Sequence, residues 1–300
     1  MDKNNEKGKI DRILVPIDFS DYSLNACFFA LHLSASQNAE IRLFHAFFNP
    51  MVDAMTFPDA FTYQSNMAEV FHELEQNART EINQFSKKIK RYAKLKKLEK
   101  VKIKTEVAAG QPGDAIENAI RSFNPGIIII GTRGHGKGSS EVLGSVATRV
   151  IDSGGTPVLL VTRDATLNEN KPIKVLYATN FEESDYNAIR SLVNTLAGYS
   201  IKLECAHFSS GSDSKEDLHN SDRMSEIKDY FTNNLKNIPV ECHIIKSDNM
   251  LEGLNDFVEV HDIDLISLTH KKRNLFYRLL NPSLAKKLLF KTNRPVFVFN

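Results

Sequence analysis

The sequence predicts a doubly wound α/β protein built from two tandem units, and three observations support this prediction. Short apolar, β-branched runs alternate with longer segments whose apolar residues recur at three- and four-residue steps, as strands alternating with helices do. The order of these segments repeats once along the 300 residues. Strands that are separated by helices need crossover connections, which make them parallel and place helices on both faces of the sheet.

The first unit has the order β-α-β-α-β-α-β-α-β. Its longest helix is expected near residues 66–95, where apolar residues from Met67 to Tyr92 form one stripe. We interpret this stripe as core packing. The clearest strands of this unit are ILVPIDFS at 13–20, IRLFHAFF at 41–48, GIIIIGTRG at 126–134 and TPVLLV at 156–161.

The second unit repeats these segments in the same order. Ser145 precedes Pro157 by twelve residues, and Ser283 precedes Pro295 by the same interval, which fixes the alignment of the two halves. His45 and His207 then fall at equivalent positions, for which we expect a shared structural role. The matching strands are VLYATNFE at 175–182, KLECAHFS at 202–209, DLISLTHKK at 264–272 and RPVFVF at 294–299.

These alignments predict two domains, at residues 1–163 and 172–300, with the polar segment RDATLNENKP at 163–172 as the linker. Each half is long enough to bury its own core. The closing strands of both halves are apolar and begin with proline, so each needs a covering neighbour.

Composition excludes several classes of partner. The 38 basic residues nearly balance 37 acidic ones, which argues against binding nucleic acid. A basic run at 87–104 is interpreted as a solvated helix end, with an electrostatic footprint for nucleic acid or an acidic partner as the alternative. No stretch reaches the roughly 18 apolar residues that span a membrane. The polar start and three scattered cysteines predict a cytoplasmic protein with reduced thiols and no metal site.

The strongest chemical motif follows the strand at 126–134. Gly131, Gly134, Gly144 and Ser145 have the spacing Gly-2x-Gly-9x-Gly-Ser and lead into a helical segment. Glycines let backbone N–H groups approach an anion, and the start of a helix adds unpaired N–H groups and a positive dipole end. The pattern therefore favours phosphate binding, although a tight loop with a capping serine is the alternative.

Asp18 lies at the end of the first strand. With the strand order 3-2-1-4-5, the first and fourth strands flank the point where the order reverses, and ligands bind there in doubly wound sheets. We therefore expect Asp18 and Gly131 to face one crevice. The alternative is that Asp18 caps the next helix together with Ser20.

These residues resemble the universal stress protein family in its tandem two-domain, Rossmann-like form. The resemblance to its ATP-binding members covers the first half and implies a bound ATP or other adenine nucleotide, with or without magnesium. It places Asp18 at the family's adenine-contacting position, Pro16 and Ala46 along the adenine pocket, and the N–H of Val146 at the phosphates. The implied binding set is Pro16, Asp18, Ala46, Gly131, Gly134, Gly144, Ser145 and Val146.

The same resemblance implies that the last strands pair with each other. In the family this strand pairs across a dimer. Here the two halves are expected to form an intramolecular pseudo-dimer, and further homodimerisation and an unidentified protein partner stay open.

The second half departs from the motif at each point. Thr269, Lys272 and Pro282 replace the three glycines, and Asn180 stands where Asp18 does. Phe208 matches Ala46, where a phenyl ring would fill the space of an adenine. We therefore predict that the second half is a degenerate copy.

The function expected from these features is that of a cytoplasmic regulatory or stress-response protein that senses a nucleotide. No catalytic residue is predicted, because the motif lacks a Walker-type Lys-Ser/Thr pair and an evident water-activating base. Two alternatives stay open, namely a slow ATPase or adenylating transferase and a ligand-free scaffold. The aromatic insert at 47–63 is either a lid or an interdomain contact.

Overall fold

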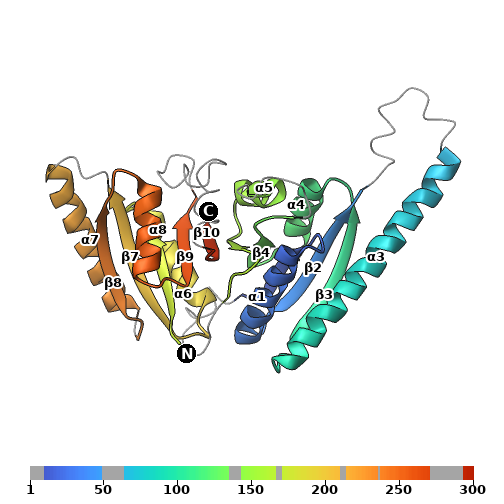
Figure 1. Cartoon of the computed structure of the whole chain (residues 1–300), viewed down its shortest axis with the longest axis horizontal. Helices are drawn as coiled ribbons and strands as arrows, with labels where there is room; N and C mark the ends of the chain where they lie inside the picture. Colours follow the sequence, from blue (N-terminus) through green and yellow to red (C-terminus); the bar gives the residue numbers. More distant parts are fainter. Residues whose placement is uncertain are drawn as a thin grey trace.

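The computed structural model of the protein describes residues 10–48, 64–134, 143–166, 171–209, 214–235, 237–270 and 293–300. Ten strands form one continuous sheet in the order β3-β2-β1-β4-β5-β10-β9-β6-β7-β8, with helices on both faces (Figure 1). The sheet therefore contains the predicted order 3-2-1-4-5 twice, once in each half of the chain. Pairs within each half are parallel, as the crossover argument requires.

The elements follow the predicted alternation. The first half contains β1 (Arg12–Pro16), α1 (Asp21–Gln37), β2 (Glu40–Phe47), α3 (Gln64–Leu95), β3 (Lys102–Ala109), α4 (Pro112–Phe123), β4 (Ile127–Gly131), α5 (Ser145–Ser153) and β5 (Val158–Val161). The second half contains β6 (Ile173–Ala178), α6 (Glu183–Thr195), β7 (Ile201–Ser209), α7 (Ser214–Asn234), β8 (Val240–Lys246), α8 (Met250–Val260), β9 (Leu265–Thr269) and β10 (Val296–Phe299). Residues 49–63, 135–142 and 271–292 lie outside the described ranges, and with them most of the aromatic insert, Lys272 and Pro282.

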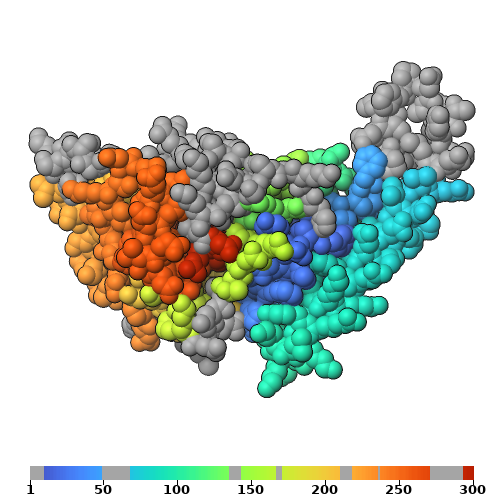
Figure 2. All heavy atoms as spheres, viewed as in Figure 1, coloured from blue at the N-terminus to red at the C-terminus, as the bar shows by residue number. Residues whose placement is uncertain are grey.

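The two halves meet at β5 and β10, which pair antiparallel. Leu160 lies opposite Val296, and Val158 lies opposite Val298. Every residue of both strands is buried. Figure 2 shows the C-terminal strand between the two halves. The expected intramolecular pseudo-dimer is therefore confirmed, and each closing strand covers the apolar edge of the other.

Two apolar layers run along the sheet and cross from one half to the other. One layer includes Ile82 and Phe85 of α3 together with Phe231 of α7. The other includes Ile116 of α4 and Leu254 of α8. The stripe of α3 packs as core between Ala78 and Ala93. Each half thus places its helices on the same two faces (Figure 1).

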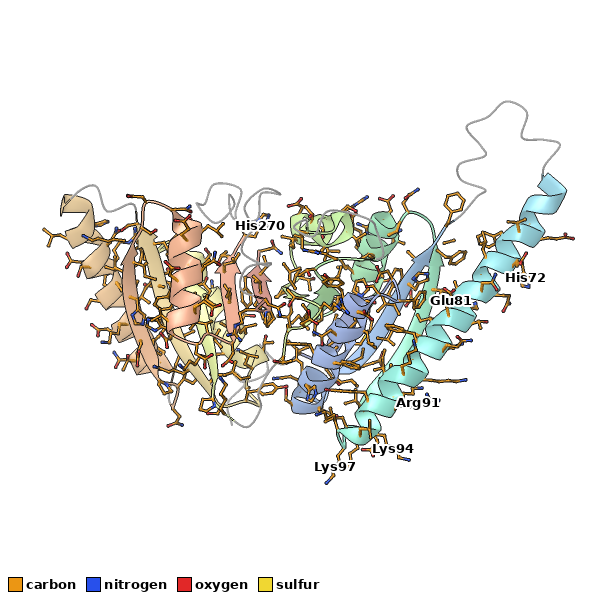
Figure 3. The ribbon with its side chains drawn as sticks, viewed as in Figure 1. His72, Glu81, Arg91, Lys94, Lys97 and His270 are labelled. Atoms are coloured by element: carbon orange, nitrogen blue, oxygen red, sulfur yellow. The ribbon has the colours of Figure 1, made fainter. Side chains whose placement is uncertain are left out.

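The basic run lies along the exposed C-terminal part of α3 and the segment after it. Arg91, Lys94 and Lys97 are exposed and project from this end of the molecule (Figure 3). This placement fits the interpretation as a solvated helix end. Within the described ranges, no helix is at once long and apolar enough to span a lipid bilayer.

The repeat extends to backbone conformation and single hydrogen bonds. Phe19 and Phe181, which follow β1 and β6, both have a left-handed backbone, with φ of 66° and 62°. His45 donates its Nδ1–H to the carbonyl oxygen of Ile17, and His207 donates in the same way to Thr179, both at 2.9 Å. The shared structural role that was expected for the two histidines is confirmed.

Candidate functional site

One cavity of about 440 Å³ lies at the carboxyl ends of β1, β2 and β4, bordered by α4 and α5. The structure brings the whole predicted binding set to this cavity, although its members come from separate segments of the chain. This is the edge of a doubly wound sheet at which the strand order reverses. The predicted residues that line it are Pro16, Asp18, Ala46, Gly131, Gly134, Gly144, Ser145 and Val146.

The wall between β2 and α4 is largely apolar. Phe44, Ile116 and Leu143 line it and are nearly fully buried. Ala46 carries only a methyl group, which leaves the space beside it open. Pockets of this kind, apolar with a few polar groups, suit flat organic ligands. The sequence analysis missed these wall residues because their apolar side chains also fit ordinary core positions.

Asp18 occupies the border between β1 and α1. Its Oδ1 accepts hydrogen bonds from the backbone N–H of Ser20 at 3.2 Å and from the Ser20 hydroxyl at 2.6 Å. Ser20 in turn caps α1 by accepting from the N–H of Ser23. The alternative role of Asp18 at the helix start is therefore present, through its Oδ1. The other carboxylate oxygen, Oδ2, lies against Gly134, where a Cβ would approach it to 2.2 Å.

Two of the three motif glycines exclude a side chain, each for a different reason. A Cβ on Gly131 would lie 2.8 Å from the Cβ and 2.9 Å from the carbonyl carbon of Tyr22, so this glycine lets α1 pack onto β4. Gly134 makes room for the Asp18 carboxylate. At Gly144 the nearest atoms would be 3.6 Å away, which is ordinary contact. Its N–H already donates to the carbonyl oxygen of Thr132.

The start of α5 supplies the anion-binding chemistry. Helix geometry leaves the first-turn N–H groups, including those of Ser145 and Val146, without acceptors inside the helix. No acidic residue stands in this first turn, so the positive dipole end is not neutralised locally. This is the arrangement that binds phosphates at helix starts.

Arg133 adds a positive charge that the sequence analysis did not single out. It lines the cavity between the first two glycines, and its guanidinium carbon lies 5.8 Å from the centre of the Tyr22 ring. Its position inside the glycine motif was the available signal, but a motif written as spacing says nothing about the intervening side chains.

The helices that border the cavity are linked by ion pairs. Arg149 of α5 donates to Glu117 of α4 at 2.7 Å and also to Asp114. The hydrogen bond from Arg149 to Glu117 is the main reason why the pKa of Arg149 is raised. These contacts fix the start of α5 relative to the apolar wall.

The second half fills the corresponding edge with its own side chains. Asp185, which is 2% exposed, accepts hydrogen bonds from the Tyr177 hydroxyl at 3.0 Å and the Thr179 hydroxyl at 2.7 Å. Thr269, in place of Gly131, lies 2.6 Å from the Tyr177 hydroxyl. Burial, and then the Asp185 charge, raises the pKa of Tyr177 well above its usual value. Phe208, in place of Ala46, is packed in the core at 4% exposure.

Comparison with known proteins agrees with this geometry. The model of the universal stress protein family matches residues 9–162. Universal stress protein YxiE of Bacillus subtilis is 30% identical over 152 residues, covering 50% of this chain and 98% of its own length. Universal stress protein MJ0531 of Methanocaldococcus jannaschii is 30% identical over 155 residues, covering 51% and 82%. These matches each span about half of the chain.

Solved structures resemble the whole chain. A universal stress protein from Archaeoglobus fulgidus covers 97% of this chain and 96% of its own, with a TM-score of 0.62 and 19% identity. A functionally unknown protein from Pseudomonas aeruginosa, PA1789, covers 99% and 94%, with a TM-score of 0.59 and 11% identity. At such identities the likeness concerns the fold, and both halves share it.

Proposed function

The chain belongs to the universal stress protein family, and we propose that its first half binds ATP or another adenine nucleotide. In this proposal the protein is a cytoplasmic stress-response or regulatory protein whose nucleotide occupancy changes its surface or its choice of partner. Residues 1–163 form the binding domain, and residues 172–300 form a degenerate domain that completes the pseudo-dimer.

One observation carries the proposal: the cavity joins an apolar wall to an anion-binding helix start. A nucleotide has the same two parts, a flat base and a charged phosphate chain. The adenine would lie near Pro16 and Ala46, within reach of Asp18. The phosphates would lie at the N–H groups of Ser145 and Val146, within the field of α5.

The lining supports binding more than rapid catalysis. The described residues around the cavity include no lysine of the Walker type, and their basic groups are Arg133 and His45. The Nδ1 of His45 is engaged with the carbonyl of Ile17, so this histidine has a structural task. Magnesium would reach the protein through the phosphates of the nucleotide. We therefore propose a nucleotide sensor in which hydrolysis, where it occurs, is slow.

The test is calorimetric titration of ATP, with and without magnesium, into the full chain and three variants. Asp18→Ala removes the carboxylate, and Gly134→Lys copies Lys272 of the second half. Asn180→Ala is the matched control, because Asn180 occupies the Asp18 position of the degenerate half. We expect one site per chain, lost in the first two variants and kept in the control.

Other outcomes separate the alternatives. Two ATP sites per chain, or one site whose affinity is unchanged in Asp18→Ala and Gly134→Lys, would contradict the assignment. Release of phosphate at an enzyme-like rate, accelerated by a co-substrate, would favour the transferase or ATPase alternative. A melting temperature that ATP leaves unchanged would favour the ligand-free scaffold.

A further inference from the structure

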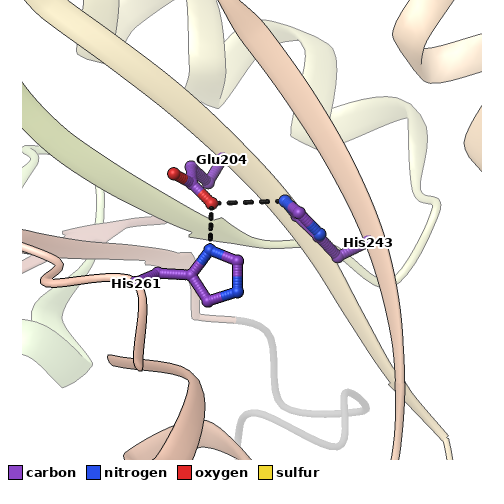
Figure 4. A group of neighbouring side chains, drawn as sticks. All are labelled: Glu204, His243 and His261. Carbon is purple, nitrogen blue, oxygen red and sulfur yellow. Dashed lines mark ion pairs between the residues drawn. The ribbon is translucent and has the colours of Figure 1, made fainter. Parts of the chain in front are cut away.

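A second group of chemically active side chains lies in the other half of the protein, away from the nucleotide cavity. Glu204 of β7, His243 of β8 and His261 at the C-terminal end of α8 point toward one another (Figure 4). Glu204 Oε2 lies 3.2 Å from His243 Nε2 and 2.9 Å from His261 Nδ1. One ligand atom from each residue lies within 4.8 Å of the others.

Two of the three facing atoms of this group are buried without a hydrogen bond. Glu204 is 1% exposed, and in the described part of the chain neither its Oε2 nor the Nε2 of His243 has a hydrogen-bond partner. The contacts have ion-pair distances, but their geometry is not that of hydrogen bonds. Buried polar atoms in native proteins are nearly always partnered by protein, water or an ion. Apart from the ion-pair contacts among the three residues, the centre of this group is therefore open to a further partner.

The other oxygen of Glu204 has a different environment. Its Oε1 lies 3.4 Å from the Lys202 ammonium, which also lies 2.7 Å from Glu241 Oε1. The ion pair between Lys202 and Glu241 has a counterpart in the first half with the charges reversed, where Glu40 lies 2.8 Å from Lys104. The lysine therefore belongs to a structural pair that the repeat retains, and Glu204 Oε2 is the oxygen that faces the histidines.

The first half provides an internal comparison for the three positions. Strand register places Arg42 where Glu204 stands, and Glu106 where His243 stands. Phe123 is the last residue of α4, and His261 directly follows α8. Each is followed by a residue with a left-handed backbone, so the two positions are equivalent. There the Arg42 guanidinium donates to Glu106 at 2.8 Å and lies 3.7 Å from the centre of the Phe123 ring. In the first half, the charged groups at these positions are therefore partnered within the protein, by an ion pair and by a cation–π contact.

At the same positions the second half has a glutamate and two histidines, which are residue types that coordinate metal ions. The His261 ring keeps the packing role of an aromatic residue, since it stacks on Phe257 with centroids 3.8 Å apart. Its Nδ1 nevertheless faces Glu204. A phenylalanine would provide the same aromatic packing, so packing does not explain why a ring nitrogen lies at this position.

We propose that Glu204, His243 and His261 form a binding site for a divalent first-row transition-metal ion, with zinc as the ion that fits best. Zinc binds imidazole nitrogen and carboxylate oxygen at about 2.0–2.2 Å, so neighbouring ligand atoms in a tetrahedral site lie about 3.3 Å apart. The observed separations of 3.2 and 2.9 Å come close to that value. Magnesium and calcium prefer oxygen ligands, so two imidazoles disfavour them.

The surroundings suit such an ion. The side chains of His243 and His261 are 25% and 29% exposed, so an ion can enter and keep one position for water or another ligand. Coordination would tie β7 and β8 to the end of α8 and stabilise the second half.

The test uses the full chain after treatment with a chelator, titrated with Zn²⁺ alone in a calorimeter. We expect one ion per chain. His261→Phe copies Phe123 of the first half and Glu204→Gln keeps the shape of the side chain, so both variants should fold. Each should weaken zinc binding by more than roughly 100-fold, because loss of an outer-shell partner alone costs about 10- to 100-fold.

His219→Ala is the matched control, because it removes an exposed histidine elsewhere in the second half. This variant should bind zinc as the unchanged chain does. Zinc should also raise the melting temperature of the unchanged chain and of the control, but not of the two site variants. Circular dichroism checks that each variant is folded. No stoichiometric zinc binding, binding that both site variants retain, or equal loss in His219→Ala would overturn the proposal.

Discussion

A single methyl group on Gly134 should disable the nucleotide site while leaving the fold in place. In Gly134→Ala the new Cβ would lie 2.2 Å from Asp18 Oδ2 and 3.3 Å from its Cγ. Because the backbone of Gly134 is not left-handed, alanine adds steric contact without strain in φ. The nearest atom is the far end of a side chain, so the Asp18 carboxylate moves and the backbone does not.

The size of the effect follows from what Asp18 does. Displacing its carboxylate costs about 0.5–1.5 kcal/mol in folding, the price of an off-rotamer side chain. In the proposed binding mode, the change removes a hydrogen bond from a charged group to the ligand, which would contribute about 1.5–3 kcal/mol. This corresponds to a rise in Kd of about 10- to 150-fold. The loss of ATP affinity should therefore exceed the loss of folding stability.

The assay is ATP titration by calorimetry together with thermal unfolding, and Gly126→Ala, outside the cavity, is the control. A Cβ on Gly126 would meet its nearest atoms at 3.5 Å, and alanine keeps the N–H that donates to Arg12. The control should change binding by no more than about 0.5 kcal/mol, as neutral substitutions do. Equal affinity in Gly134→Ala and Gly126→Ala would refute the reasoning about Asp18.

Three further predictions concern packing, the cavity and the thiols. Gly131→Ala should lower stability by about 1–3 kcal/mol through overpacking against the Tyr22 backbone, seen by differential scanning calorimetry as a Tm lower by several degrees. Ala46→Phe should fill the cavity as the second half does, abolishing the rise in Tm that ATP causes while the circular dichroism spectrum stays unchanged. Iodoacetamide should label Cys242 first, because a hydrogen bond from the neighbouring thiol lowers its pKa and forms the thiolate at lower pH. Cys27, whose pKa burial raises, should react only on unfolding.

Each of these predictions can fail in its own way. An unchanged Tm in Gly131→Ala would mean that α1 moves away from β4 at little cost. ATP stabilisation that survives Ala46→Phe would place the base elsewhere than beside β2. Labelling of Cys27 at the rate of Cys242 in the native protein, followed by mass spectrometry across the pH range, would contradict the burial that separates them.

The sequence was a good guide to the fold because local patterns and topology agree. Buried strands such as Ile127–Gly131 read as continuous apolar runs, and parallel pairing follows from the helices between them. The repeat showed two apolar closing strands that need cover, and the family resemblance implied the pairing of β5 with β10 that the structure has. The bounds of α3 were also close, because its apolar stripe has a helical period.

The site was less accessible from the sequence, for physical reasons. A glycine motif shows where side chains are excluded, but not which neighbour excludes them. The structure assigns Gly131 to helix packing and Gly134 to the Asp18 carboxylate, a distinction that depends on distances between segments far apart in the chain. The sequence likewise gave no reason to expect the proposed metal site. The cysteines lack metal-binding spacing, and Glu204 and His261 come together only when β7 and α8 pack.

The second half supports the proposed nucleotide site through the sheet itself. Helix α5 leads directly into β5, whose four residues are all buried. Strand β10 covers the outer edge of β5 by antiparallel pairing, and its own inner edge is held by β9. Without the second half, β5 would be an exposed apolar edge, and the helix that precedes it would lose its anchor. The core of the second half therefore supports the first site through the sheet, although the residues at its own strand ends differ from those of the first half, as Thr269 does from Gly131.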